Sequence, residues 1–469
     1  MDVTPVSYAL VSDLYWVPLS EVDAHRVRER FTIEKRIPVY GTNRVEKQII
    51  PTWREDVRQR PGMIGVPIAA GETLFPTDNV MEELSDGAPF ESWTRLPDPN
   101  HERAAPGQED FMRLTWEAVT GAYTALIKAE TGTGKTVVAL GTAARLGRRT
   151  LILVPSVNLL RQWIDQVQNI LGVPRSSIGV VQGDKCQWQK DVVIGMLKSN
   201  AMRVYPPEFY TAFGTVFYDE LHNLGAVLAA KTQGLFNARF KAGLTATDDR
   251  RDGADEVYYD YFGKPAFERS MPGVETTVYS VTLQTPPVSG RGNTDKALKL
   301  SRNHERNETL ARLAVAAFRR GHHILMVSAF VEHCELMKRY LLALGLRDTD
   351  VGVFTGQQTD PDGRRSKTTE QYLDWCKRSP RAIVATYGML TEGVDIPRLD
   401  FGMDITPQSE MEQVLGRVRR RIPGKVRAIW VTARDRKTPS LEGSYHARIR
   451  SIRHLQNVDV RKVAVDELL

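Results

Sequence analysis

The sequence predicts an α/β protein with two parallel-sheet domains in tandem. Two series of short apolar runs, bounded by turns and separated by helical lengths of chain, lie at 125–247 and 323–433. A chain of 469 residues is about three times the usual length of one domain, which leaves room for both series. The first 100 residues instead mix short β-forming pieces with acidic loops that contain Pro and Gly, which predicts a small mixed α/β domain at the N-terminus.

Each apolar run is expected to be one buried strand. In the first series the runs are ALIKAE (125–130), TLILVP (150–155), DVVIGM (191–196), GTVFYDE (214–220) and FKAGLTAT (240–247). The second series follows the helical NETLARLAVAAFRRG (307–321) with HILMVSAF (323–330), DVGVFTG (350–356), RAIVATYGM (381–389), FGMDIT (401–406) and VRAIWVTA (426–433). The segment TLQTPPVSGRGNTDK (282–296) is rich in Pro, Gly, Ser and Thr and is expected to connect the two series. The predicted domains are 1–103, 104–280 and 281–469.

Composition and cysteine usage exclude several classes of protein. The chain contains 42% hydrophobic and 26% charged residues, close to the globular average, which excludes wholesale disorder and fibrous repeats. Cys186, Cys334 and Cys376 lie too far apart for a disulfide framework or a cysteine-rich zinc site. Asp2 and Asp13 disagree with a secretory signal, and no run of 18 apolar residues predicts a membrane span. We expect a cytoplasmic protein that has no membrane partner.

Charge is distributed unevenly along the chain. Residues 1–100 carry 11 basic and 16 acidic side chains, residues 101–270 carry 20 and 18, and residues 271–469 carry 32 and 23. A basic domain can hold a polyanion through its phosphates. A solvated, arginine-rich face would have the same composition, so charge alone leaves both interpretations open.

A glycine-rich turn follows the strand TALIKA and precedes the helical stretch VVALGTAARL. Its glycines allow successive backbone N–H groups to face one anion, and the helix N-terminus adds its dipole. Lys135 can reach the β- and γ-phosphates of ATP, and Thr136 can ligate Mg²⁺. The residues expected to bind the nucleotide are Glu130, Thr131, Gly132, Thr133, Gly134, Lys135 and Thr136. The alternative is a structural turn with an incidental Lys-Thr pair, since Ala129 stands where the looser pattern has Gly.

An acidic pair follows the apolar run TVFY. A phosphate loop requires a carboxylate at the end of a neighbouring strand to hold the metal, so Asp219 is expected to bind Mg²⁺ directly or through water. Glu220 is expected to polarise the attacking water, and His222 to couple the site to the next segment. His222 has no second His or Cys at zinc spacing and is not expected to bind a metal. The alternative for the acidic pair is a solvated turn.

The stretches A-E-T-G-T-G-K-T and D-E-L-H resemble motifs I and II of superfamily 2 nucleic-acid helicases of the DExH type. Further stretches between residues 108 and 421 are similar to motifs of this family in the same order. They are LILVPSVNLLRQW (151–163, motif Ia), GLTATDDRRDG (243–253, motif III), ILMVSAFVEH (324–333, motif IV), ATYGMLTEGVDIP (385–397, motif V) and QVLGRVRR (413–420, motif VI). The R-x-D-G after motif III and the compact size most resemble phage UvsW-like and XPB-like ATP-dependent DNA helicases. The resemblance implies that both parallel-sheet domains are RecA-like.

Motif VI places Gln413, Gly416, Arg417 and Arg420 three or four residues apart, so one helix face is expected to present both guanidinium groups. In the family these arginines act on the γ-phosphate as arginine fingers. A helix face that binds only phosphate backbone is the alternative. The residues with an implied catalytic role are Lys135, Asp219, Glu220, Gln413, Arg417 and Arg420.

The remaining motifs imply contacts with ligands and coupling between them. The implied nucleic-acid contacts are Pro155, Ser156, Arg161, Thr386 and Gly388, and the implied further nucleotide contacts are Gln108, Gly393 and Asp395. Leu159, Leu160 and Trp163 of motif Ia are expected to be core residues. Thr245 and Thr247 are implied to link the ATP state to domain closure, as His222 is, although Asp248 stands where the family often has Pro.

The resemblance implies an ATP-dependent helicase or translocase that holds ATP and Mg²⁺ in the cleft between its RecA-like domains. DNA, single-stranded, duplex or branched, is the expected partner; RNA is not excluded, and replication or recombination proteins are further partners. For a phage-encoded chain the location is the host cytoplasm. The alternatives are an annealing factor that uses ATP as a switch, an RNA helicase, and a restriction-type motor, which would need a nuclease carboxylate cluster. The stretch HARIRSIRHLQ (446–456) is either a basic helix on DNA or a solvated one.

Overall fold

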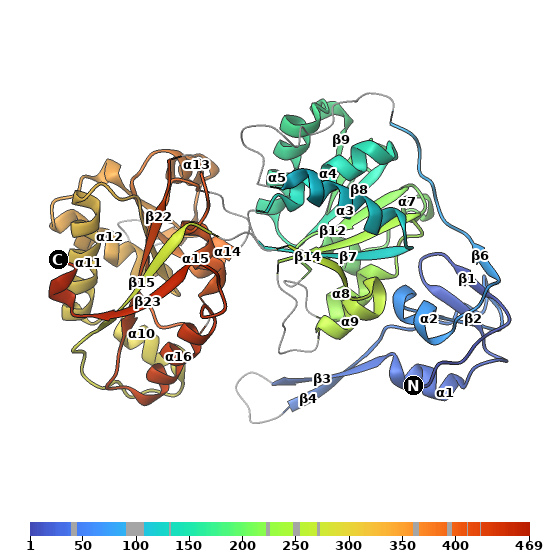
Figure 1. Cartoon of the computed structure of the whole chain (residues 1–469), viewed down its shortest axis with the longest axis horizontal. Helices are drawn as coiled ribbons and strands as arrows, with labels where there is room; N and C mark the ends of the chain where they lie inside the picture. Colours follow the sequence, from blue (N-terminus) through green and yellow to red (C-terminus); the bar gives the residue numbers. More distant parts are fainter. Residues whose placement is uncertain are drawn as a thin grey trace. The chain divides into compact units, whose positions relative to one another are not determined.

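The structure is a computed structural model of the whole chain (Figure 1). It describes residues 1–38, 45–90, 107–130, 133–221, 226–246, 254–269, 273–359, 365–391, 396–409, 411–422 and 424–469. These residues form two compact units, Met1–Met271 and Pro272–Leu469.

The first unit is built on a sheet in the strand order β10-β9-β11-β8-β12-β13-β7-β14. The strands are β7 (Thr124–Ala129), β8 (Thr150–Val154), β9 (Ile178–Gln182), β10 (Lys185–Cys186), β11 (Val192–Met196), β12 (Thr215–Tyr218), β13 (Phe240–Thr245) and β14 (Pro265–Arg269). All neighbours are parallel except the short edge strand β10, which runs antiparallel to β9. The five apolar runs of the first series are therefore strands, as predicted, whereas β9 and β14 were not predicted.

Helices cover both faces of this sheet, so its strands are apolar on both sides. Figure 1 shows α3 (Gln108–Thr120), α4 (Lys135–Leu146) and α5 (Val157–Gln166) on one face and α8 (Ala226–Gln233) and α9 (Ala254–Phe262) on the other. The short helices α6 (Leu197–Met202) and α7 (Pro207–Tyr210) follow β11. Alternate residues of one strand enter two different cores: Ile152 and Val154 of β8 pack with α4 and α5, and Leu151 and Leu153 pack with α8 and α9.

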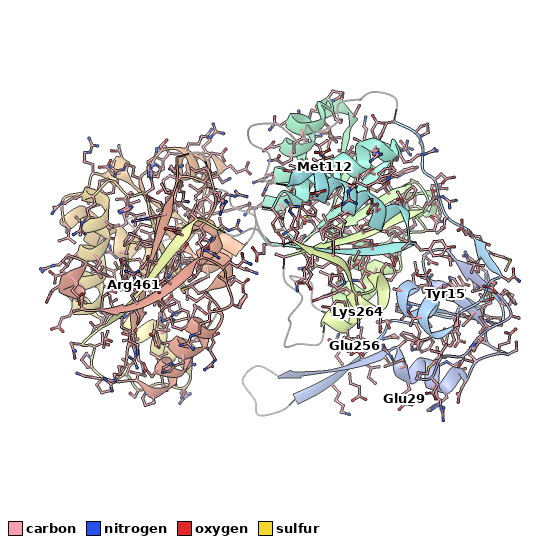
Figure 2. All side chains as sticks on the ribbon, viewed as in Figure 1. Tyr15, Glu29, Met112, Glu256, Lys264 and Arg461 are labelled. Carbon is pink, nitrogen blue, oxygen red and sulfur yellow. The ribbon has the colours of Figure 1, made fainter. Side chains whose placement is uncertain are left out.

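The N-terminal elements share the second of these cores. They comprise β1 (Ala9–Val11), β2 (Tyr15–Pro18), β5 (Met63–Val66) and β6 (Val80–Glu82) in one sheet, the hairpin β3 (Thr32–Pro38) and β4 (Val45–Pro51), and helices α1 (Ala24–Arg30) and α2 (Ile68–Leu74). Trp16 and Ile64 pack in the same apolar cluster as Tyr258 of α9. The guanidinium of Arg30 lies 2.7 Å from Asp260 and 3.4 Å from Glu256, which is labelled in Figure 2. The N-terminal elements thus pack against α8 and α9 on one side of the parallel sheet.

The second unit repeats the architecture with the strand order β17-β20-β16-β21-β22-β15-β23, all parallel. The strands are β15 (Glu275–Thr282), β16 (Ile324–Ser328), β17 (Val351–Phe354), β20 (Ala382–Thr386), β21 (Phe401–Asp404), β22 (Arg427–Arg434) and β23 (Val458–Val463), with a separate hairpin of β18 (Gln357–Thr359) and β19 (Arg365–Lys367). The helices are α10 (Asn293–Leu300), α11 (His304–Arg319), α12 (Val331–Ala343), α13 (Glu370–Arg378), α14 (Tyr387–Thr391), α15 (Glu412–Val418) and α16 (Pro439–Arg450). No helix within the described ranges is long and apolar enough to span a membrane.

The two parallel sheets have one topology. When the strands of each are numbered along the chain and β10 is left out, both orders are 3-4-2-5-6-1-7. Two tandem RecA-like sheets of this kind confirm the predicted fold class. The predicted boundary at residue 280 falls inside β15, and 282–296 does not connect the sheets, because β15 pairs along its whole length with β22 of the second sheet. Its polar Thr and Ser residues concealed an interior strand, and the change of unit lies between residues 271 and 272.

Candidate functional site

The carboxyl ends of four neighbouring strands carry the motifs of the first unit. The glycine-rich loop follows β7, motif III ends β13, the acidic pair follows β12 and motif Ia follows β8. Because parallel strands end at one edge of the sheet, these segments lie together although they are far apart in the chain. In the second unit, motif V follows β20, motif IV ends β16 and motif VI follows β21, which are also adjacent strands.

The phosphate-loop segment has the backbone that anion binding requires. Gly134 precedes α4 with φ +94°, a conformation that L side chains rarely adopt. The hydroxyl of Thr133 donates to the carbonyl oxygen of Glu130 at 2.7 Å, and the Lys135 ammonium donates to the carbonyl oxygen of Ala129 at 2.6 Å. The N-terminus of a 12-residue helix therefore opens at the end of β7. Thr136 follows in the first turn of that helix, half-buried, and the predicted residues Thr131 and Gly132 lie outside the described residues.

Gln108 lies against this loop. Its side chain is 3% exposed, at the start of α3. A Cβ atom placed on Gly134 would stand 2.5 Å from the Gln108 amide nitrogen, so a larger residue at 134 would collide with it. The structure thus places Gln108 beside the loop, and the contact with adenine stays a prediction.

Asp219 follows β12 and is 5% exposed. Its main-chain N–H donates to the carbonyl oxygen of Leu153, and its carboxylate accepts a 2.7 Å hydrogen bond from the indole N–H of Trp163. Burial, reinforced by the neighbouring Glu220 carboxylate, raises the pKa of Asp219 to about 7, while Trp163 and the positive charge of Lys135 oppose the rise. The fold therefore leaves the negative charge of Asp219 incompletely balanced, and a bound cation would balance it.

Glu220 has a strained backbone. Its φ of +52° lies in the left-handed region, which costs a non-glycine residue on the order of 1–3 kcal/mol. The buried Leu221 follows it. The predicted coupling residue His222 lies outside the described residues.

The donors at this edge fit a magnesium–nucleotide complex. Mg²⁺ in such sites takes one or two protein oxygens and fills its remaining positions with phosphate and water. Thr136 and Asp219 supply a hydroxyl and a carboxylate of that kind. Within the described ranges there is no group of three or more His, Cys, Asp or Glu that would hold a metal without phosphate.

Motif Ia has one structural role that the sequence did not suggest. Leu159, Leu160 and Trp163 are buried as expected, but Trp163 also donates to Asp219, 56 residues away. Ser156 caps α5, because its hydroxyl accepts from the N–H of Leu159 at 3.3 Å. Pro155 precedes it, half-buried, and Arg161 is exposed. A buried tryptophan usually pairs its indole N–H with an acceptor. This tendency is the sequence feature that could have predicted a polar partner for Trp163.

Motifs III and V occupy strand ends in the two units. Thr245 is fully buried as the last residue of β13, opposite Lys128 of β7. Thr386 ends β20, and Gly388 lies in α14, where an added Cβ would meet nothing within 4 Å. Thr247, Asp248, Gly393 and Asp395 lie outside the described residues.

The structure of motif VI differs from the prediction that one helix face presents both arginines. Gln413 and Arg417 lie on α15, but this helix ends at Val418, so Arg420 does not share its face. Arg419 ends the helix because its carbonyl oxygen accepts from the N–H of Val274 and its guanidinium donates to the carbonyl of Gln456. Burial lowers the pKa of the Arg420 guanidinium. Gly416 has no neighbour within 4 Å of an added Cβ.

The C-terminal basic stretch is partly core. Arg448 of α16 is 1% exposed, so the expectation of a helix wholly on DNA or in solvent is wrong for this residue. Its guanidinium lies 3.4 Å from Asp404 and donates to the carbonyl oxygen of Gln408 at 2.7 Å. Gln408 belongs to the segment that leads from β21 into α15, so α16 helps to fix the start of motif VI.

Comparison with known proteins agrees with this arrangement. The family model described as "Type III restriction enzyme, res subunit" matches residues 102–250, which contain motifs I to III. A relative from Escherichia phage T5, "Probable helicase D10", is 29% identical over 320 residues, covering 66% of this chain and 67% of the relative. These matches support the superfamily 2 helicase family that the motif order predicted.

Two further matches show how much of their own length the known proteins share with this chain. A protein of Acanthamoeba polyphaga mimivirus that bears the name of an ATP-dependent RNA helicase is 25% identical over 303 residues, covering 62% of this chain and 56% of that protein. The matched region thus spans between 56% and 67% of these relatives. A solved fragment of an HsdR subunit of a type I restriction enzyme from Vibrio vulnificus shares the fold, with 19% identity, a TM-score of 0.52 and coverage of 76% of this chain and 68% of the fragment.

Proposed function

We propose that this superfamily 2 helicase is an ATP-driven translocase that unwinds or branch-migrates DNA. The observation that carries the proposal is the edge of the first sheet, where the phosphate loop after β7 and the buried Asp219 after β12 flank the strand that ends in Thr245. A phosphate cradle and a strand-end carboxylate are the two parts that a P-loop nucleotide hydrolase requires.

Residues of the first unit would bind ATP with Mg²⁺. Lys135 leaves the Ala129 carbonyl and reaches the β- and γ-phosphates, while Thr136 and Asp219 hold the metal. Bound Mg²⁺ supplies neutralisation of the developing phosphate charge. Glu220 orients the attacking water, and Gln108 with residues 130–134 surrounds the remainder of the nucleotide.

Residues of the second unit would complete hydrolysis and bind the polymer. Gln413, Arg417 and Arg420 stabilise charge on the γ-phosphate, and Gly393 and Asp395 of motif V are further proposed nucleotide contacts. The nucleic-acid contacts are Pro155, Ser156, Arg161, Thr386 and Gly388, and the coupling residues are His222, Thr245 and Thr247. Most of these contacts are with the backbone, so we expect low sequence specificity and a marked salt dependence.

The nature of the polymer is the finer part of the proposal. The motif pattern favours DNA through its resemblance to phage DNA helicases, whereas the mimivirus relative carries the name of an RNA helicase. ATP hydrolysis is measured with single-stranded, duplex and forked DNA and with RNA of matched length. We expect forked DNA to stimulate most strongly. Stronger stimulation by RNA would change the substrate, and no stimulation by any polymer would refute the translocase function.

Lys135→Ala tests the nucleotide site. Removal of the ammonium should abolish ATP turnover in a protein that keeps its circular dichroism spectrum, because the phosphate loop relies on this charge to bind the β- and γ-phosphates. Lys128→Ala is the matched control, since Lys128 lies on β7 and forms an ion pair with Glu268 at 3.0 Å. Retained turnover after Lys135→Ala would contradict the assignment.

A further inference from the structure

Trp163 forms a buried hydrogen bond with the carboxylate that the proposed function assigns to the metal. The indole is 1% exposed, and its N–H lies 2.7 Å from Oδ2 of Asp219. This is a short bond for an N–H donor and an ionised acceptor. Among the described residues, Trp163 is the side-chain donor to the Asp219 carboxylate, and the main-chain N–H of Glu220 also donates to it.

The bond determines how the carboxylate can turn. The main-chain N–H of Asp219 is fixed by the Leu153 carbonyl, so the backbone at this position is held by β8. With Oδ2 committed to the indole, the rotation of the side chain is restricted and Oδ1 is the oxygen left for a cation. Lys135 places a positive charge near Asp219, but no ion pair joins Asp219 to a Lys or Arg of the described residues.

Trp163 also belongs to the helix that begins with motif Ia. Ser156 caps α5 at its N-terminus, and Trp163 lies seven residues further along, about 10 Å at the α-helical rise. Leu159, Leu160 and Trp163 form the buried side of the helix, while Arg161 is exposed. A displacement of the exposed end would therefore move the indole, and with it the carboxylate.

We propose that Trp163 is a positioning residue that holds the Asp219 carboxylate for the metal–nucleotide complex and transmits nucleic-acid binding at the start of α5 to that carboxylate. The proposal rests on the proposed function for the identity of the ligands. An apolar residue could fill the same core position, so packing alone does not require a tryptophan. The positioning role requires the indole N–H. Outer hydrogen bonds of this kind change metal affinity by about 10- to 100-fold when they are removed.

Trp163→Phe in the full chain tests the role, because it removes the N–H and keeps most of the ring. The readout is the affinity for Mn²⁺ in the presence of a non-hydrolysable ATP analogue, measured by electron paramagnetic resonance. We expect a loss of at least about tenfold in Mn²⁺ affinity, with the analogue itself bound within about threefold of wild type at saturating metal. In the wild type, single-stranded DNA should also tighten Mn²⁺ binding, and this effect should be absent from the variant.

The matched control is Trp430→Phe. Trp430 is a buried tryptophan of the second unit that donates to Asp404 at 2.9 Å, so its substitution removes an equivalent bond away from the phosphate loop. It should leave Mn²⁺ affinity unchanged. A change of equal size in both variants, or no change after Trp163→Phe, would overturn the proposal.

A wild-type measurement keeps the proposal testable if Trp163→Phe does not fold. The chain has eight tryptophans, whose indole N–H signals are resolved by NMR after ¹⁵N labelling. Mn²⁺ with the ATP analogue should broaden one indole signal far more than the others, because Trp163 is one carboxylate away from the metal. Uniform broadening, or none, would refute that placement. If the wild type binds no nucleotide at all, the proposed function fails, which is a different result from a nucleotide site that is indifferent to Trp163.

Discussion

In each unit an indole N–H donates to a buried aspartate near the end of the fifth strand of the sheet. Trp163 donates to Asp219 at 2.7 Å, and Trp430 donates to Asp404 at 2.9 Å. Asp404 is the last residue of β21 and pairs with Val327, whereas Asp219 follows Tyr218, the last residue of β12, which pairs with Leu153. The two sheets thus share a topology, and each has a buried aspartate at or just after the end of its fifth strand.

The two aspartates differ in how their charge is balanced. Asp404 has the guanidinium of Arg448 at 3.4 Å and accepts from the hydroxyl of Thr432 at 3.2 Å. Burial raises the pKa of Asp404, and Arg448 opposes that rise. Asp219 has no such cation among the described residues. The comparison teaches that a buried charge with a built-in partner supports the fold, whereas a buried charge without one marks a place for a ligand.

A second pair of groups shows the same contrast. In the second unit Arg306 and Asp435, each 1% exposed, form a bidentate ion pair at 3.0 and 3.1 Å. In the first unit the buried Lys241 donates only to the carbonyl oxygen of Ser12, at 2.8 Å. The buried charges of Arg306 and Asp435 therefore balance each other, whereas Lys241 donates to an uncharged carbonyl.

The largest expected effect tests whether the second unit also serves the nucleotide of the first. Arg417→Ala and Arg420→Ala should each lower the ATP hydrolysis rate by about 10³- to 10⁵-fold, or roughly 4–7 kcal/mol, because the proposed function assigns each guanidinium to the γ-phosphate. Binding of a non-hydrolysable ATP analogue should change little. Arg421→Ala, which changes an exposed neighbouring residue, is the control. Unchanged hydrolysis in both variants would confine the nucleotide chemistry to the first unit.

Asp404→Asn should destabilise the second unit by about 3–5 kcal/mol, because the buried Arg448 guanidinium loses its carboxylate partner. Urea denaturation measures the change in the free energy of unfolding. ATP-analogue affinity should be retained, since Asp404 belongs to the other sheet. A loss below about 1 kcal/mol would show that this pair is not the structural one.

Asp219→Asn should have the opposite effect on stability. The folded-state pKa of about 7 lies above the ordinary value of 3.8, so the contribution of this group is favourable below pH 3.8 and is lost as the pH rises through 7. At pH 8, without nucleotide or metal, the neutral amide should therefore stabilise the first unit by up to about 4 kcal/mol while ATP hydrolysis is lost. Equal stability of variant and wild type at pH 8 would contradict an unbalanced charge.

Lys241→Met should change the pH dependence of stability rather than ATP hydrolysis. Burial lowers the pKa of Lys241 from 10.5 to about 7, against the attraction of Asp13 and Glu72. The stability that this group contributes is present above pH 10.5 and is lost as the pH falls through 7, so the free energy of unfolding should rise between these values. The slope is at most about 1.4 kcal/mol per pH unit, and the substitution should flatten it. Lys338→Met, in the ion pair with Asp348, should leave the slope unchanged.

Strands that are buried on both faces could be predicted from the sequence, and strands of other kinds could not. β8 and β16 are continuous apolar runs, which the local pattern identifies. β14 and β23 alternate between half-buried and exposed residues because they lie at sheet edges. β15 pairs on both sides but carries four Thr and Ser residues, so its composition resembles that of a connector.

Those parts of the site that lie within one short segment of the chain could be predicted from the sequence. Gly134, Lys135 and Asp219 lie in short segments whose spacing requires no knowledge of the fold. The bond from Trp163 to Asp219 joins residues 56 positions apart, and only the packing of α5 on the sheet brings them together. The break before Arg420 depends in the same way on Val274 and Gln456, which hold Arg419 from distant segments.

The shared apolar core of the N-terminal sheet limits how the chain can be divided. Trp16 and Phe75 pack in one cluster with Val216 of the nucleotide-binding sheet, and Lys241, on the strand that ends in motif III, donates to Ser12. A truncated protein that begins near residue 107 would expose this apolar surface to water. It would also remove the Ser12 carbonyl that accepts from the Lys241 ammonium. Expression of the catalytic domains alone should therefore yield aggregates, and the first 90 residues must be kept in any fragment intended for crystallisation or assay.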